Sequence, residues 1–221
     1  MQISKYIDHT LLKATATKEE IIKLCSEAKE YDFYAVCVNG SYVELAAQEL
    51  RNSEVKIAAV IGFPLGAMTT ETKVFEAKSC IQKGASEIDM VINIGKLLDG
   101  ENDYVENEIR LIKEAIGNNV LKVIFENCYL SKEQVKTVSQ LAVNAGADFI
   151  KTSTGFGTSG ATLEDVQLMK EVVKDKAQIK AAGGVRDTAT AEKYIEMGVT
   201  RLGTSSGVSL VTTGVSEKDK Y

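Results

Sequence analysis

The sequence predicts an α/β protein built as a single-domain (β/α)8 TIM barrel. Short apolar runs rich in β-branched residues alternate with amphipathic helical patterns along the chain, and there are eight such runs. This repetition implies a parallel sheet with right-handed crossovers, and eight parallel strands close into a barrel. The length of 221 residues lies at the compact end of that architecture. An open, doubly wound sheet is the competing fold for the same pattern.

Each predicted strand is followed by a helical pattern. The expected strands are Ile7–Leu11, Tyr34–Val38, Ile57–Phe63, Glu87–Asn93, Leu121–Glu126, Phe149–Ser153, Gln178–Ala182 and Arg201–Gly203. The expected helices are Lys18–Lys29, Ser41–Leu50, Thr70–Lys83, Asn102–Ala115, Lys132–Asn144, Leu163–Lys174 and Thr188–Met197, with a short last helix over Gly207–Thr213. Capping-box signals precede several helices, at Thr17/Glu20, Ser131/Gln134 and Thr162/Asp165.

The chain shows no linker or break in composition, so we expect one barrel domain over residues 1–213 and a flexible polar tail over 214–221. A net charge of −5 argues against nucleic-acid and anionic-membrane partners. No apolar stretch approaches the roughly 18 residues of a membrane span, and the N-terminus lacks a signal-peptide pattern. The four scattered cysteines are then expected to be reduced thiols, and the protein cytoplasmic.

Two lysines stand inside runs that otherwise read as buried strands. They are Lys151 in "FIKTSTGFGTSG" and Lys180 in "QIKAAGGVRD". Side chains alternate faces along a strand, and a lysine that faced the helix layer would be badly placed, so both should point into the barrel. Asp89 in "EIDMVIN" is expected to join them there from the fourth strand. Two ammonium groups with one carboxylate leave a charge imbalance in a buried site.

That imbalance predicts a nucleophile. Burial and repulsion between the ammonium groups should lower the pKa of one lysine, and a neutral lysine attacks a carbonyl to form a Schiff base. A structural ion-pair network inside the barrel is the alternative interpretation. No metal ligand set is apparent, and no cofactor is expected. The only histidine, His9, is expected to make a structural hydrogen bond, and Asp8 to support a lysine.

Glycine-rich segments follow the seventh and eighth strands. Gly183 and Gly184 come after one strand, and Ser205 and Ser206 after the other, where barrels of this class often bind phosphate. We expect Arg186 to pair with a surface carboxylate rather than with the phosphate. A literal G-x-G-x-x-G lies at residues 155–160, but the next strand lacks the acidic residue of a dinucleotide site, which favours a plain glycine loop.

Together, "EIDMVINIG", "FIKTSTGFG", "IKAAGGVRD" and "IGFPLG" resemble the 2-deoxyribose-5-phosphate aldolase family, and the likeness runs from about residue 6 to 207. The resemblance implies a (β/α)8 barrel that reversibly cleaves 2-deoxy-D-ribose 5-phosphate to D-glyceraldehyde 3-phosphate and acetaldehyde. It makes Lys151 the Schiff-base lysine, and assigns proton transfer and lysine activation to Asp89 and Lys180. It also implies phosphate binding by Gly183, Gly184, Ser205 and Ser206.

Departures from the family pattern are slight: Ala14 and Gly40 stand where many relatives carry proline. The partners implied are small phosphosugars and aldehydes, and the family often forms dimers, so a homodimer is expected. Two alternatives stay open, namely a Schiff-base aldolase or transaldolase on another phosphosugar, and a non-catalytic phosphosugar-binding barrel. A polar tail of this length is long enough to reach the barrel mouth. Its aromatic hydroxyl, on Tyr221, is therefore a candidate for proton exchange at C2 of the enamine.

Overall fold

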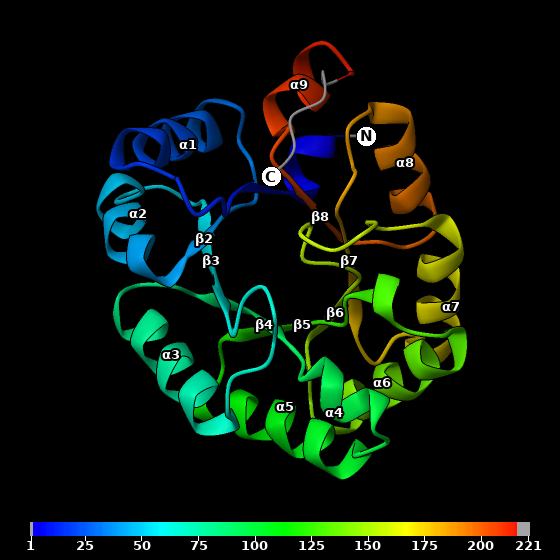
Figure 1. Cartoon of the computed structure of the whole chain (residues 1–221). Coiled ribbons are helices and arrows are strands. Elements are labelled where there is room, and N and C mark those ends of the chain that lie inside the picture. The colour runs from blue at the N-terminus through cyan, green and yellow to red at the C-terminus, as the bar shows by residue number, and fades with distance from the viewer. Residues whose placement is uncertain (1, 216–221) are drawn as a thin grey trace.

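Eight parallel strands close into a barrel in the order in which they occur in the chain, surrounded by a ring of helices (Figure 1). The structure is a computed structural model and describes residues 2–215. The strands are β1 (Ile7–Leu11), β2 (Ala35–Asn39), β3 (Lys56–Ile61), β4 (Glu87–Val91), β5 (Val120–Ile124), β6 (Phe149–Lys151), β7 (Gln178–Ala182) and β8 (Arg201–Thr204). Pairing of β8 with β1 closes the sheet, which confirms the predicted barrel and excludes the open sheet.

The helices lie outside the strands, as the apolar faces of their sequences require. They are α1 (Lys18–Glu30), α2 (Val43–Glu49), α3 (Thr70–Gln82), α4 (Ile94–Leu98), α5 (Asn102–Ile116), α6 (Lys132–Asn144), α7 (Leu163–Val173), α8 (Thr188–Glu196) and α9 (Gly207–Thr212). Three 3-10 turns, η1 (Ile3–Tyr6), η2 (Gly40–Tyr42) and η3 (Asn127–Tyr129), complete the described elements. None of the described helices combines the length and apolar character that crossing a membrane would take.

Capping signals in the sequence correspond to real helix starts. Complete capping boxes form at Thr17 and Ser131, and the Thr162 hydroxyl accepts the Asp165 N–H at 3.0 Å. These contacts satisfy backbone donors that a first helical turn leaves unpaired. The starts of α1, α6 and α7 were therefore predictable from local sequence.

The predictions differ from the structure mainly where strands end. Several strands were expected to run two residues further, for example to Asn93 and Ser153, whereas β4 ends at Val91 and β6 at Lys151. The predicted helix at Ser41–Leu50 is divided into η2 and α2, and the short helix α4 was missed. The residues just beyond these strand ends are still buried, and some continue the hydrogen bonding to the next strand: Ile92 N–H donates to the Ile124 carbonyl at 3.1 Å, and Phe125 N–H to the Lys151 carbonyl at 3.0 Å. They therefore look like strand in the sequence although the regular strand has ended.

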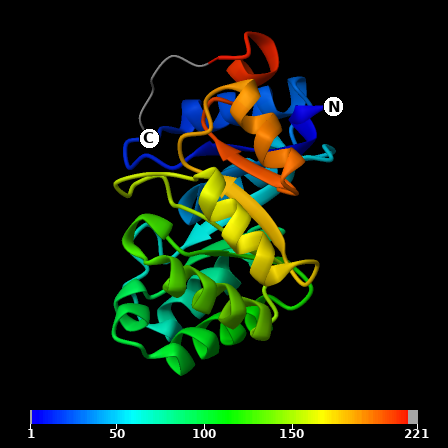
Figure 2. The same ribbon diagram turned by 90° about the vertical axis from the view of Figure 1, so that its right-hand side faces the viewer.

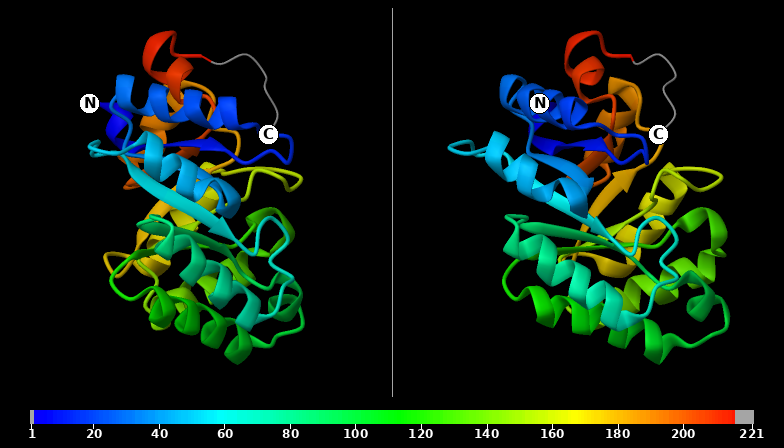
Figure 3. Two further views of the ribbon diagram at one scale, coloured as in Figure 1. Left: turned by 90° about the vertical axis from the view of Figure 1, so that its left-hand side faces the viewer. Right: turned by 60° about the vertical axis from the view of Figure 1, so that its left-hand side comes forward.

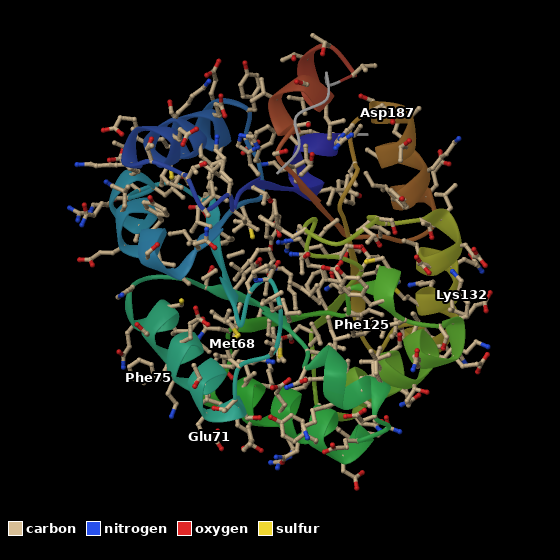
Figure 4. The ribbon with its side chains drawn as sticks, in the orientation of Figure 1. Met68, Glu71, Phe75, Phe125, Lys132 and Asp187 are labelled. Atoms are coloured by element: carbon tan, nitrogen blue, oxygen red, sulfur yellow. The ribbon has the colours of Figure 1, made fainter. Side chains whose placement is uncertain are left out.

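The two faces of the strands pack differently, against apolar side chains outside the barrel and largely against charged side chains inside it. The main apolar core lies between the barrel and the helices, with Ile88, Met90 and Leu202 among its fully buried members. A smaller apolar cluster, formed by Leu12, Cys37, Ala58 and Val60 with Phe63 against it, lies apart from that core. In the remaining barrel interior, charged side chains replace apolar ones. Figure 4 shows side chains filling the centre of the barrel, while Phe75 on α3 and Lys132 on α6 lie at the outer rim.

The loops that follow the strands gather at one end of the barrel. In side view the segment after β6, in yellow, projects from this end (Figure 2), and the segment after β3, in cyan, projects from the same end (Figure 3). Phe63 and Phe156 bring these two segments into contact, with ring centroids 5.4 Å apart and ring planes at 90°. This end is the expected location of an active site in a (β/α)8 barrel.

Candidate active site

Seven charged side chains from six strands meet in the barrel interior, and each is at most 3% exposed. They are Asp8, Glu87, Asp89, Lys122, Lys151, Lys180 and Arg201. Four are cations and three are carboxylates, so the group carries one excess positive charge if all are ionised. Each of these buried ions needs a close partner of opposite charge, because removing an ion from water costs roughly several kcal/mol.

Asp89 lies at the centre of the group. Its Oδ2 atom accepts hydrogen bonds from the Nζ atoms of Lys151 and Lys180, both at 2.8 Å. Its Oδ1 atom accepts one from Lys122 Nζ, also at 2.8 Å. The carboxylate is therefore shared by three ammonium groups. The expectation that Asp89, Lys151 and Lys180 come together in the barrel is confirmed.

Lys180 has a second carboxylate partner. Its Nζ also donates to Asp8 Oδ2, and the other oxygen of Asp8 accepts from Arg201 Nη1 at 2.9 Å. Arg201 in turn donates to Glu87 Oε2 at 2.9 Å. Asp8 thus faces the interior and supports a lysine, as predicted.

Burial and these partners shift the pKa values of Lys151 and Lys180 in opposite directions. Burial lowers the pKa of Lys151 below its ordinary value; Asp89 opposes this effect and Lys180 adds to it. Burial would lower the pKa of Lys180 too, but Asp8 and Asp89 outweigh burial and raise it. The pKa of Asp89 is held well below its usual range, because Lys122, Lys151 and Lys180 outweigh its burial. Lys180 therefore stays charged, and Lys151 is the lysine that loses its proton more readily.

Sequence reasoning missed Glu87, Lys122 and Arg201. Lys122 stands inside a predicted apolar strand, which is the same signal that identified Lys151, whereas Glu87 and Arg201 are the first residues of their predicted strands, where a charge is less conspicuous. Lys122 is paired in register with Asp89 on the neighbouring strand, and Lys180 with Arg201. The Arg201 guanidinium also lies 3.5 Å from the centre of the Tyr34 ring. These residues form the deeper part of the network.

Three of the four predicted phosphate residues line cavities, and these are two different cavities; Ser206, buried at the end of β8, lines neither of them. Gly183 and Gly184 line a cavity of about 430 Å³ together with Arg186 and with residues 155–160 of the glycine loop, which spans residues 154–160. Ser205 lines a second cavity of about 380 Å³, beside His9 and Thr10. A hydrogen bond of 2.8 Å from the Thr204 hydroxyl to the Val185 carbonyl joins the segments after β7 and β8.

Close packing explains why glycine occupies positions of the G-x-G-x-x-G sequence. A Cβ at Gly160 would lie 2.1 Å from the Gly183 carbonyl oxygen, and one at Gly157 would lie 2.6 Å from Cys128 Sγ. Only glycine permits such close approach. Arg186 differs from expectation: it lines the cavity, and among residues 2–215 no carboxylate lies within ion-pair distance of it.

Two remaining predictions concern the periphery of the site. His9 Nε2 lies 2.8 Å from Glu27 Oε2, which is the structural hydrogen bond expected for this histidine. Tyr221 lies outside the described residues, as does most of the predicted tail. Among residues 2–215, no group of three or more His, Cys, Asp or Glu side chains is arranged to hold a metal ion.

Comparison with known proteins identifies relatives over nearly the whole chain. Residues 3–212 match the family model of the DeoC/LacD family aldolases. The deoxyribose-phosphate aldolase of Exiguobacterium sp. is 52% identical over 220 residues, which cover 99% of this chain and 100% of that protein.

Solved structures agree. The aldolase QR15 matches with a TM-score of 0.90 and 43% identity, over 94% of this chain and 93% of that one. A tetrameric deoxyribose phosphate aldolase from Aeropyrum pernix matches with a TM-score of 0.86 and 31% identity, over 96% and 92% of the two chains. With the barrel and its buried lysines, these findings show that the chain belongs to the DeoC/LacD family of aldolases.

Proposed function

We propose that this chain is a Schiff-base aldolase that reversibly cleaves 2-deoxy-D-ribose 5-phosphate to D-glyceraldehyde 3-phosphate and acetaldehyde. The observation that carries the proposal is the position of Lys151, whose pKa is lowered and whose Nζ lies 2.8 Å from an Asp89 oxygen shared with Lys180. A neutral amine at the mouth of a barrel is suited to attack an aldehyde. The names of the relatives support the substrate.

Lys151 begins the reaction. Its neutral amine attacks the C1 aldehyde of the open-chain sugar, and loss of water leaves a protonated imine. The C2–C3 bond then breaks, with its electron pair moving toward the imine nitrogen, while the C3 hydroxyl loses its proton. Glyceraldehyde 3-phosphate leaves, the enamine is protonated at C2, and hydrolysis frees acetaldehyde and restores Lys151.

Asp89 and Lys180 have complementary roles in this scheme. Lys180 keeps its charge through Asp8 and Asp89, so it repels a proton on Lys151. Asp89 carries the negative charge that orders both ammonium groups, and a water held by Asp89 and Lys180 takes the C3 hydroxyl proton. The ion pair between Lys151 and Asp89 supports these roles, since no other described carboxylate pairs with Lys151.

The phosphate group is assigned to the loops after the last strands. Backbone N–H groups near Gly183 and Gly184, with the hydroxyls of Ser205 and Ser206, would hold it. Arg186 lines the same cavity as the two glycines and adds positive charge there. The domain limits and the homodimer remain predictions; the relative from Aeropyrum pernix is a tetramer.

Reductive trapping tests the mechanism. Acetaldehyde with borohydride should attach an ethyl group irreversibly to Lys151, located by peptide mass spectrometry, and Lys151→Ala should lose both the adduct and cleavage activity. Lys170→Ala, at the surface, should change neither. Absence of an adduct on Lys151 in active protein would exclude the Schiff base. Trapping without cleavage of 2-deoxyribose 5-phosphate would favour another phosphosugar, and neither reaction would favour a non-catalytic binding barrel.

A further inference from the structure

Glu126 is a buried carboxylate at the mouth of the barrel that the proposed mechanism does not use. It follows β5 by two residues and is 2% exposed. The backbone on both sides of it continues the ladder to β6: Phe125 N–H donates to the Lys151 carbonyl and Asn127 N–H to the Thr152 carbonyl, both at 3.0 Å. Glu126 therefore lies against the segment that carries Lys151. Figure 4 shows Phe125, its neighbour, inside the ring of helices.

The backbone of Glu126 is in an unfavourable conformation. Its φ of 57° and ψ of 62° are left-handed, a conformation that is unfavourable for a residue with a Cβ. A single glycine would avoid this cost. The side chain of Glu126 must therefore make contacts that offset this conformation and that a glycine could not make.

The side chain of Glu126 binds one residue of the glycine loop, residues 154–160. Glu126 Oε1 accepts the Thr154 N–H at 3.2 Å, and Oε2 accepts the Thr154 hydroxyl proton. The same hydroxyl oxygen accepts the Phe156 N–H at 2.9 Å. Through these hydrogen bonds, Glu126 is tied to the backbone and the side chain of Thr154, three residues after Lys151.

Packing brings the loop directly onto this carboxylate. A Cβ at Gly157 would lie 3.0 Å from Glu126 Cδ, so the loop backbone approaches as closely as glycine allows. Beyond this contact, Gly155, Gly157 and Gly160 line the cavity that also contains Gly183 and Arg186. The burial of Glu126 raises its pKa, and the hydrogen bonds from Thr154 act in the opposite direction.

We propose that Glu126 is a positioning residue for the substrate phosphate: it holds Thr154, and through Thr154 it holds the glycine loop as one wall of the phosphate cavity. This role rests on the proposed function for the identity of the phosphorylated substrate. Glu126 itself does not contact the reacting atoms. Its loss should therefore affect binding of the phosphorylated sugar and leave imine formation at Lys151 in place.

The test compares kcat and KM for 2-deoxyribose 5-phosphate and for unphosphorylated 2-deoxyribose. In Glu126→Gln and in Thr154→Val, the KM for the phosphorylated sugar should rise at least about tenfold, the effect of losing one hydrogen bond to a charged group. The KM for 2-deoxyribose and borohydride trapping with acetaldehyde should stay near parent values. Thr154→Ser keeps the hydroxyl and should bind the phosphorylated sugar almost as the parent does.

Two controls separate positioning from general stability. Glu108→Gln alters another fully buried carboxylate, paired with Lys73 at 2.8 Å, and should leave the ratio of the two KM values unchanged. The double variant Glu126→Gln/Thr154→Val should lose clearly less than the sum of the two single variants, because both changes disrupt the hydrogen bond between the Thr154 hydroxyl and the Glu126 carboxylate. Equal losses for both sugars, or additive losses in the double variant, would overturn the proposal.

A measurement without substrate keeps the inference separate from the proposed function. Hydrogen exchange should show faster exchange for a peptide covering the glycine loop in Glu126→Gln, with the strands of the barrel unchanged. Unchanged exchange in the loop would contradict the positioning role. If the parent protein neither traps acetaldehyde nor cleaves the sugar, the proposed function fails, whatever the exchange result.

Discussion

Lys151 and Lys180 are paired in register on neighbouring strands, and both donate to the same oxygen of Asp89, each at 2.8 Å. The two ammonium groups are held together by one carboxylate although they repel each other. Asp8 then decides which lysine keeps its proton, because it contacts Lys180 and not Lys151. The asymmetry of the pair therefore comes from β1, far away in the sequence.

Lys180→Leu should raise the pKa of Lys151. The change removes a repelling charge and leaves Asp89 Oδ2 to Lys151 alone, so the protonated form is favoured. Less neutral amine is then present at pH 7, and the pH profile of borohydride trapping with acetaldehyde should move to higher pH. A profile that coincides with that of the parent would contradict activation by Lys180. Lys170→Leu at the surface serves as the control.

Arg201→Met should destabilise the fold without touching Lys151. The guanidinium is the partner of both Asp8 and Glu87, and its removal leaves buried carboxylates short of a cation. Breaking a buried ion pair in this way costs about 3–5 kcal/mol, which urea unfolding at pH 7 measures. Arg110→Met breaks an exposed pair with Glu114 and should cost about 1 kcal/mol or less. Similar losses in both variants would show that the network adds no stability.

The double variant Ser205→Asp/Ser206→Asp should bind the phosphorylated sugar much more weakly than the parent, and should bind 2-deoxyribose nearly as well. The two carboxylates would repel a phosphate held at the end of β8, whereas a neutral sugar is not repelled. The KM values for the two sugars measure the difference. Thr212→Asp adds a charge on the exposed part of α9 and is the control. A similar rise in both KM values would place the phosphate elsewhere.

Gly160→Ala should separate the loops that follow β6 and β7. The added methyl would lie 2.1 Å from the Gly183 carbonyl oxygen, which is backbone and cannot rotate away. Such overpacking costs about 1–3 kcal/mol, and thermal unfolding should detect it together with a raised KM for the phosphorylated sugar. Gly95→Ala is a matched control, since its nearest contact would be an ordinary 3.6 Å. An unchanged melting temperature in Gly160→Ala would show that the two segments shift apart without cost.

Local patterns in the sequence were enough to predict the barrel and part of its site. The alternation of strands and helices is encoded in residues close together in the chain, so periodicity and capping signals were sufficient for most elements. Lys151 and Lys180 were detectable because a charge inside an apolar run is conspicuous. Strand ends were less predictable, since apolar residues at the mouth resemble strand residues.

Only the tertiary structure decided how the charged groups are paired. Asp8, Asp89, Lys180 and Arg201 come from four different strands, and closure of the barrel between β8 and β1 brings Asp8 to Lys180 across 172 positions of sequence. Likewise, nothing near Glu126 in the sequence indicates that its carboxylate binds Thr154. The sequence by itself identified Lys151, Lys180 and Asp89 as buried charges, whereas the burial of Glu87, Lys122 and Arg201 became apparent only in the closed barrel. Their protonation depends on distance and burial, which exist only after the strands have closed.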